Sequence, residues 1–84
     1  MAQRKKIEVF SAGCRACDEA VDLVKRLAGN DHDVEVLDMH QGHVASKATF
    51  HGVRSVPAVV VDGRLAACCV GHGVDEALLR AALA

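Results

Sequence analysis

The chain has 84 residues, and it is poor in aromatic residues, in proline and in net charge. Tryptophan and tyrosine are absent, and Phe10 and Phe50 are the two phenylalanines, so a hydrophobic core has to be built from aliphatic side chains. The formal net charge is −1 and there is no basic block, which argues against nucleic acid or an anionic membrane as the main partner.

Long apolar runs are also missing, so no stretch of the sequence predicts a membrane span. The basic residues 4–6 resemble the start of a secretion signal, but Glu8 interrupts the apolar run that would have to follow. We therefore expect a cytoplasmic protein, folded as a single monomeric domain over residues 1–84. In that compartment the four cysteines are more often redox-active or metal-binding than structural disulfides.

What the sequence does contain is a Cys-x-x-Cys pair, Cys14 and Cys17, between an apolar strand pattern over residues 7–10 and a helical pattern. A helix start carries unpaired N–H groups and a partial positive charge, which favour a thiolate. A cysteine at that position can have a lowered pKa and react faster near neutral pH. We expect Cys14 to be the exposed, attacking thiol and Cys17 the resolving thiol, with the charge of Arg15 also favouring the thiolate.

The hydrophobic periodicity along the chain predicts strands over residues 5–10, 33–38, 57–61 and 64–70, and helices over 14–27, 44–51 and 74–83. Gly29 and Asn30 end the first helix, and Asp62-Gly63 is typical of a two-residue hairpin turn. The positions expected to face inward are Val44, Ala48 and Phe50 in the second helix and Val74, Ala77, Leu78 and Ala81 in the third. The order β-α-β-α-β-β-α, with a right-handed first crossover, predicts an α/β fold.

This arrangement resembles the thioredoxin fold, and the chain is similar to small glutaredoxin-like and thioredoxin-like proteins. The resemblance rests on Cys14-x-x-Cys17, on Ser55-Val56-Pro57 before the third strand and on the Asp62-Gly63 hairpin. It implies a four-stranded mixed sheet in the order 2-1-3-4, flanked by helices. It also implies a cis Pro57 beside the cysteine pair, and a Val56 backbone that pairs with the substrate.

The chain departs from these families around the cysteines. Thioredoxins typically have a tryptophan where this sequence has Gly13, and glutaredoxins have Pro-Tyr where it has Arg15-Ala16. The redox poise of the pair is therefore left open by the sequence.

The resemblance further implies a ligand site at the start of the last helix. Glutaredoxins have a Gly-Gly-x-x-Asp segment there that receives a carboxylate of glutathione, and in this chain Gly71 and Asp75 match it while His72 replaces the second glycine. A helix N-terminus suits an anion, although Asp75 also suits a helix start without any ligand. The implied electron donor is glutathione or a reductase of the thioredoxin-reductase type, with no bound cofactor.

Other residues have two interpretations each. Glu8 lies six residues before Cys14, where thioredoxins often have a buried acid that takes a proton from the resolving cysteine; a solvent-facing strand residue is the alternative. Cys68 and Cys69 are neighbours on a strand and must point to opposite faces, as apolar fillers or with one as a regulatory thiol. The remaining candidates, expected at the surface, are His40, His43 and His51.

Taken together, the sequence predicts a thiol-disulfide oxidoreductase that reduces protein or small-molecule disulfides. The same cysteines could serve a soft-metal-binding module, although metal chaperone domains end in a strand and this chain ends in a helical pattern. An iron–sulfur cluster held between two chains by Cys14 and glutathione is a further alternative, and so is a non-catalytic binding module.

Overall fold

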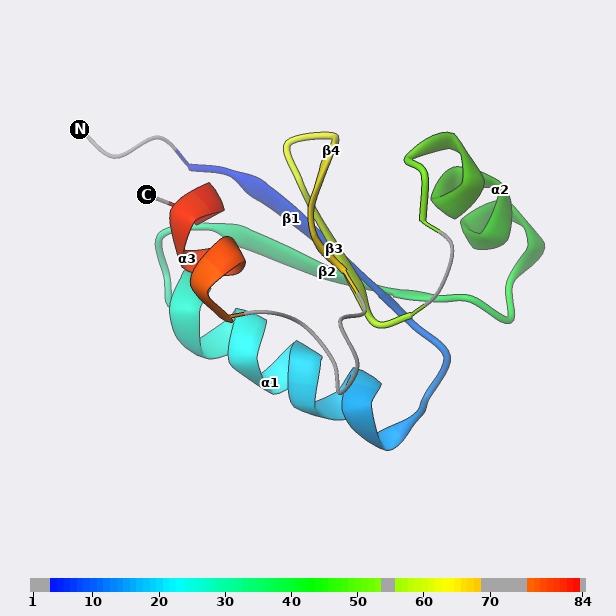
Figure 1. The fold of residues 1–84 in the computed structure, drawn as a ribbon, viewed down its shortest axis with the longest axis horizontal. Helices are drawn as coiled ribbons and strands as arrows, with labels where there is room; N and C mark the ends of the chain where they lie inside the picture. Colours follow the sequence, from blue (N-terminus) through cyan, green and yellow to red (C-terminus); the bar gives the residue numbers. More distant parts are fainter. Residues whose placement is uncertain (1–3, 54–55, 69–75, 84) are drawn as a thin grey trace.

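The computed structural model describes residues 4–53, 56–68 and 76–83. Within these ranges the strands and helices follow one another in the predicted order (Figure 1). They are β1 (Lys6–Ser11), α1 (Arg15–Ala28), β2 (Asp33–Asp38), α2 (Gly42–Phe50), β3 (Ala58–Val61), β4 (Arg64–Cys68) and α3 (Glu76–Leu83).

The strands form one mixed sheet in the order β2-β1-β3-β4, which confirms the predicted topology. β2 runs parallel to β1, and β3 and β4 are each antiparallel to the preceding neighbour in the sheet. Phe10 near the end of β1 is opposite Ala58 at the start of β3, and Ala58 is opposite Cys68 at the end of β4. The end of β1, the start of β3 and the end of β4 therefore meet at one edge of the fold.

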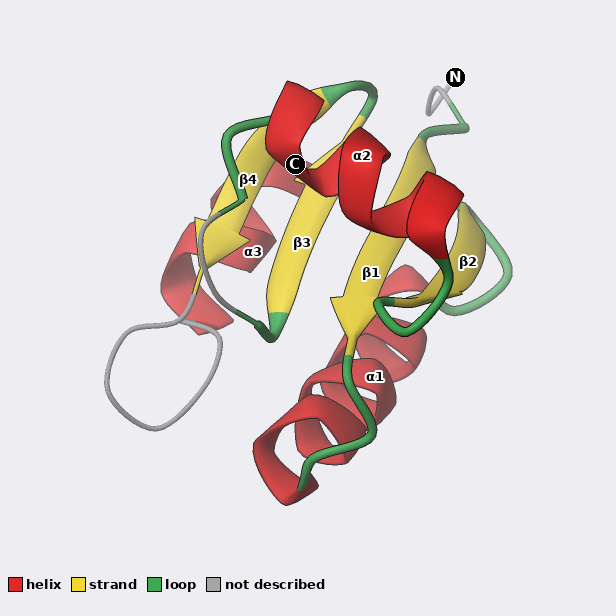
Figure 2. Ribbon diagram, turned by 90° about the vertical axis from the view of Figure 1, so that its right-hand side faces the viewer, coloured by secondary structure: helices red, strands yellow, loops and turns green. Residues whose placement is uncertain are grey.

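The helices cover both faces of the sheet, with α1 and α3 on one side and α2 on the other (Figures 1 and 2). Side chains alternate along a strand, so β1 and β3 each contribute buried residues to two cores. The buried residues under α1 and α3 are Ile7, Val9, Val24, Ala28, Val59, Val61 and Leu79. Those under α2 are Phe10, Val44, Ala48, Val53, Ala58 and Val60. Both cores are almost wholly aliphatic, as the composition requires.

Helix α1 is one-sided, as predicted from the spacing of its apolar residues. Its buried residues recur every three or four positions: Cys17, Ala20, Val24 and Ala28. The helix ends at Gly29, whose φ of 54° lies in the left-handed region and whose N–H donates to the carbonyl of Lys25 at 3.0 Å. A glycine at this position satisfies one of the last helical carbonyls without side-chain strain.

The predicted inward face of α2 is confirmed at Val44 and Ala48 and is wrong at Phe50, and the predicted face of α3 is wrong. Phe50 is 85% exposed, because it lies roughly 200° around α2 from the inward-facing Ala48. In α3 the buried residue is Leu79, with Ala82 and Leu83 packed against the same core. The predicted Ala77, Leu78 and Ala81 are exposed, and Val74 lies outside the described residues. The spacing of Leu79, Ala82 and Leu83 defines the inward face of α3. The sequence did not show this face, because the alanines of this segment are compatible with several faces.

The predicted hairpin is present between β3 and β4. Asp62 and Gly63 have φ angles of 50° and 82°, the pair of positive values that a two-residue hairpin turn requires. Asp62 also exchanges hydrogen bonds with the backbone of Lys6, both at 2.9 Å, which ties the turn to the start of β1. A register shift between Val59 and Val60 in the β3–β4 pairing was not predicted.

Candidate functional site

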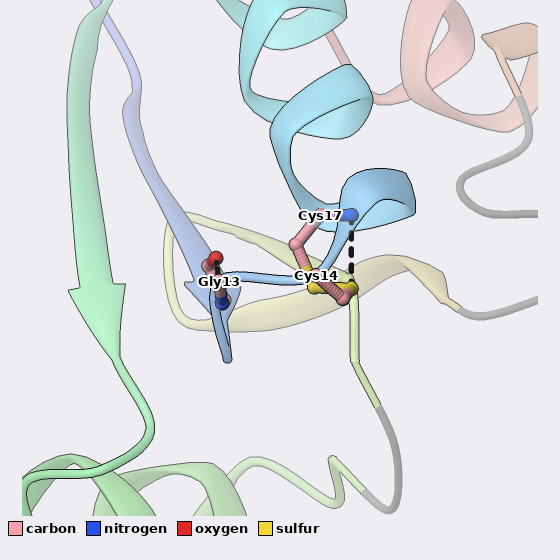
Figure 3. Close-up of a disulfide and its surroundings, with 4 residues drawn as sticks. Gly13, Cys14 and Cys17 are labelled. Carbon is pink, nitrogen blue, oxygen red and sulfur yellow. Dashed lines mark hydrogen bonds between the residues drawn. A yellow bond between two sulfur atoms is a disulfide. The ribbon is translucent and has the colours of Figure 1, made fainter.

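The cysteine pair lies at the N-terminus of α1. Cys14 is the N-cap residue, with an extended backbone at φ −77° and ψ 164°, and its carbonyl accepts from the N–H of Asp18 at 3.0 Å. Its sulfur accepts a hydrogen bond from the N–H of Cys17 at 3.1 Å, drawn as a dashed line in Figure 3. A free N–H of the first helical turn is thus directed at the sulfur on which a negative charge develops when the pair is reduced.

Cys14 and Cys17 form a disulfide, with their Cα atoms 5.0 Å apart (Figure 3). The two residues differ in exposure: Cys14 is exposed, whereas Cys17 is fully buried. An incoming thiol can therefore approach the sulfur of Cys14, while that of Cys17 is covered. Arg15, the first residue of α1, is exposed beside Cys14.

Ser11 and Gly13 fix the conformation of the loop that leads to Cys14. Gly13 has a φ of 81°, and its N–H donates to the hydroxyl oxygen of Ser11 at 3.1 Å. A Cβ added to Gly13 would meet nothing within 4 Å, so the left-handed backbone, and not a lack of space, favours glycine here. The carbonyl of Ser11 accepts from Met39 N–H at 2.9 Å, which joins this loop to the end of β2.

Pro57 follows a cis peptide bond, as the resemblance implied. It is buried and directly precedes Ala58, the residue opposite Phe10 in the sheet. Since β1 leads from Phe10 to the cysteines, the cis bond and the cysteine pair lie at the same end of the sheet. Val56 is half-buried there.

Glu8 is buried, so its interpretation as a solvent-facing residue is wrong. Its neighbours across the sheet are Glu35 and Val60, and Val60 belongs to the core under α2. Its carboxylate pairs with Lys47 of α2, and this hydrogen bond raises the pKa of Lys47. Cys17, in contrast, belongs to the helix that covers the opposite face of the sheet.

Several predicted site residues lie outside the described residues. Gly71, His72 and Asp75, implied as a glutathione site, are among them, and so is Cys69. The backbone of Cys68 ends β4 opposite Ala58, so this strand returns to the cysteine end of the sheet.

Sequence reasoning missed a pocket beside the cysteine loop. Its volume is about 210 Å³, and it is lined by Ser11, Ala12, Gly13, Val36, Asp38 and His40. Asp38 Oδ1 accepts from the backbone N–H of His40 and contacts His40 Nδ1, both at 2.9 Å. The backbone hydrogen bond from His40 is the main cause that lowers the pKa of Asp38 below its usual value. The sequence feature that could have indicated this pocket is the Asp38-x-His40 pair at the end of β2, the strand parallel to β1.

In the described part of the chain, no three histidine, cysteine or acidic side chains are grouped so that they could hold a metal ion. The helices of that part are also too short or too polar to cross a membrane.

The fold and the cysteine position define the class of the protein: it is a small thioredoxin-fold protein with a Cys-x-x-Cys pair. The sequence profile described as the thioredoxin domain matches residues 5–83, so the chain belongs to the thioredoxin domain family. The match supports the thioredoxin side of the predicted resemblance.

The chain is also similar to three known proteins. An uncharacterized 9.0 kDa protein from the mobE 3′ region of Acidithiobacillus ferrooxidans is 51% identical over 80 residues, which are 95% of this chain and 94% of that protein. A mutant thioredoxin from Halobacterium salinarum NRC-1 superimposes with a TM-score of 0.68 at 28% identity, covering 96% of this chain and 73% of that one. A malarial protein shares the fold, with a TM-score of 0.66, 19% identity and coverage of 98% and 100%.

Proposed function

We propose that this protein is a dithiol oxidoreductase that reduces disulfides in proteins or small molecules. The observation that carries the proposal is the unequal exposure of a bonded pair at a helix start. Cys14 is exposed at the N-cap of α1 and Cys17 is buried one turn further on. Thioredoxin-family membership supports the same chemistry.

The reaction starts from the reduced pair. The Cys14 thiolate attacks one sulfur of the substrate disulfide, the substrate S–S bond breaks, and the first substrate thiolate leaves with the electron pair of that bond and takes a proton. Cys17 then loses its proton and attacks the sulfur of Cys14. The bond from Cys14 to the substrate breaks, the second substrate thiolate leaves, and the Cys14–Cys17 disulfide forms. The substrate gains two electrons and the pair loses two.

The N-terminus of α1 has a role in both steps. Its N–H groups and partial positive charge stabilise Cys14 as attacking thiolate and again as leaving group, through the contact from the Cys17 N–H. Two electrons from a thiol donor then restore the dithiol. Two glutathione molecules, or a flavin-dependent reductase of the thioredoxin-reductase type, are the donors that we propose.

The experiment is a redox titration of the protein in glutathione buffers, with free thiols alkylated and counted by mass. Trypsin cuts after Lys6, Arg15 and Lys25, so Cys14 and Cys17 fall on separate peptides, residues 7–15 and 16–25. Cys68 and Cys69 share a third peptide, residues 65–80, which reports on them separately.

A two-electron transition in which peptides 7–15 and 16–25 lose their label together supports the proposal. Its midpoint is expected within the range of known dithiol proteins, roughly −270 to −120 mV. A pair that stays reduced in every buffer, or that reacts with the label only after a chelator is added, overturns the proposal and favours a metal-binding role.

A further inference from the structure

The pocket beside the cysteine loop, named here the Asp38 pocket, joins the ends of two parallel strands. Ser11 at the end of β1 is opposite Asp38 at the end of β2, and the Met39 N–H donates to the Ser11 carbonyl. From Ser11 the chain runs through the pocket wall to Gly13 and then directly to Cys14. Consecutive Cα atoms are about 3.8 Å apart, so the wall ends within a few bonds of Cys14.

The lining combines apolar side chains with hydrogen-bond acceptors. Ala12 and Val36 are the apolar members, and Val36 is 45% exposed. Asp38 and His40 are the polar members. Nδ1 of His40 lies 2.9 Å from Oδ1 of Asp38, so the imidazole and the carboxylate are in direct contact.

Asp38 supplies the pocket with a carboxylate. The N–H of His40 donates to the carboxylate of Asp38 and lowers its pKa, so Asp38 stays ionised well below pH 7. Arg15, the cation next to Cys14 in the sequence, does not belong to the lining. An ionised carboxylate offers acceptors to N–H groups and favours a positive charge.

We infer that the Asp38 pocket binds an ammonium or guanidinium group that the substrate carries a few bonds from its disulfide. The inference rests on the proposed function and adds a substrate class to it: cationic disulfides. The pocket volume of about 210 Å³ corresponds to roughly seven water molecules at about 30 Å³ each, enough for a short aminoalkyl chain. Such a group is found in disulfides of small aminothiols and in proteins with lysine or arginine beside the cysteine.

The experiment compares three small disulfides of different charge: cystamine, which is cationic, hydroxyethyl disulfide, which is neutral, and dithiodipropionate, which is anionic. The reduced protein reacts with each under single-turnover conditions, and each rate is divided by the rate with dithiothreitol to remove the intrinsic reactivity of the disulfide. The neutral compound also corrects for any change in the nucleophilicity of Cys14.

The decisive variant is Asp38→Asn, which removes the charge and keeps an oxygen that can accept from the His40 N–H. The matched control is Asp33→Asn, the same change at the opposite end of β2, where the carboxylate pairs with Arg4. We expect the wild-type protein to prefer cystamine to the neutral disulfide, and Asp38→Asn to reduce this preference about three- to fivefold, the range of partly exposed charge contacts. Asp33→Asn should leave it unchanged.

The outcomes separate the two proposals. Reaction with all three disulfides, but an equal charge preference in the wild type and in Asp38→Asn, overturns the cationic pocket and leaves the oxidoreductase in place. No reaction with any disulfide overturns both.

A second arm distinguishes the sources of the cation. It uses a peptide disulfide with lysine next to cysteine and its glutamate counterpart. A preference for lysine that Asp38→Asn removes extends the inference to protein substrates, whereas a preference confined to cystamine restricts the class to small aminothiols.

Discussion

The buried carboxylate of Glu8 in β1 forms an ion pair with the ammonium group of Lys47 in α2. Glu8 is 4% exposed, and apart from this pair its Oε2 has no hydrogen-bond partner in the part of the chain that the structure describes. The pair lies on the sheet face covered by α2, whereas Cys17 lies on the helix that covers the other face. We therefore assign the Glu8–Lys47 pair a structural role, which is to hold α2 against the sheet.

Removing Lys47 alone should be worse than removing both partners. Lys47→Met leaves the Glu8 carboxylate buried without its cation, so we expect the Tm to fall by several degrees. The double variant Glu8→Gln, Lys47→Met should recover part of the loss, and Lys25→Met, an exposed lysine of α1, is the control. Thermal unfolding at pH 7 is measured for the wild type, Glu8→Gln, Lys47→Met, the double variant and the control. A double-mutant cycle without coupling between the two positions would contradict the structural role.

The same pair predicts a dependence on alkaline pH. The hydrogen bond to Glu8 raises the pKa of Lys47 above its usual 10.5. A raised pKa in the folded state means that the stabilisation is fully present below 10.5 and is lost as the pH rises through the higher folded value. The difference in Tm between wild type and Lys47→Met should therefore be constant near pH 9 and shrink above pH 10.5. A difference that stays constant to pH 12 would contradict this assignment.

How much the sequence could predict depends on the range of the interactions. The hairpin at Asp62-Gly63 and the one-sided face of α1 are local features, and both are confirmed. The face of α3 depends on which of two adjacent leucines meets the sheet. Leu78 and Leu79 have the same side chain, but only Leu79 is buried. Only the packed structure decides between them.

The candidate site shows the same limit. The Cys14-x-x-Cys17 motif is local and could be placed at a helix start from the sequence. The Asp38 pocket joins the ends of two strands that are separated by the whole of α1, so the sequence did not show that Asp38 lies beside the cysteine loop.

The two single variants, Cys14→Ser and Cys17→Ser, should give different products when they react with a disulfide. Cys17→Ser keeps the exposed attacking thiol and lacks the resolving thiol, so it should accumulate a mixed disulfide between Cys14 and the substrate. Cys14→Ser should form no such adduct at either position, because Cys17 is buried. Mass spectrometry of the tryptic peptides after reaction with hydroxyethyl disulfide checks this. An adduct on Cys17 in the Cys14→Ser protein would reverse the assigned roles.

Arg15 should increase the reactivity of Cys14 through its charge. Arg15→Gln removes an exposed positive charge next to the attacking sulfur. The reduced protein should therefore react roughly two- to threefold more slowly with iodoacetamide near neutral pH, because the Coulomb effect between exposed charges in water is well under about 1 kcal/mol. Arg15→Lys should restore the rate. Arg64→Gln, the same change on the exposed hairpin, is the control, and an equal slowing there would contradict a local effect.

Adjacent leucines in α3 provide a matched test of the core. Leu79 is fully buried, so Leu79→Ala should cost about 2–5 kcal/mol of stability, while the half-exposed Leu78→Ala should stay within about 0.5 kcal/mol. Urea unfolding measures both. If Leu79→Ala is too unstable to analyse, Leu79→Val should show an intermediate loss. Equal losses at the two positions would contradict the observed face of α3.

Alanine substitutions at Gly13 and Gly42 distinguish the effect of backbone strain from the effect of a lack of space. A Cβ at either position would meet nothing within 4 Å, but Gly13 has a φ of 81°, whereas Gly42 is the first residue of α2. Gly13→Ala should therefore cost about 1–2 kcal/mol from the left-handed backbone alone. Gly42→Ala should stabilise the protein by up to about 1 kcal/mol, because alanine favours the helix. Since Gly13 precedes Cys14, Gly13→Ala should also slow alkylation of Cys14, which Gly42→Ala should leave unchanged. A stable Gly13→Ala protein with normal Cys14 reactivity would show that the loop tolerates another backbone conformation.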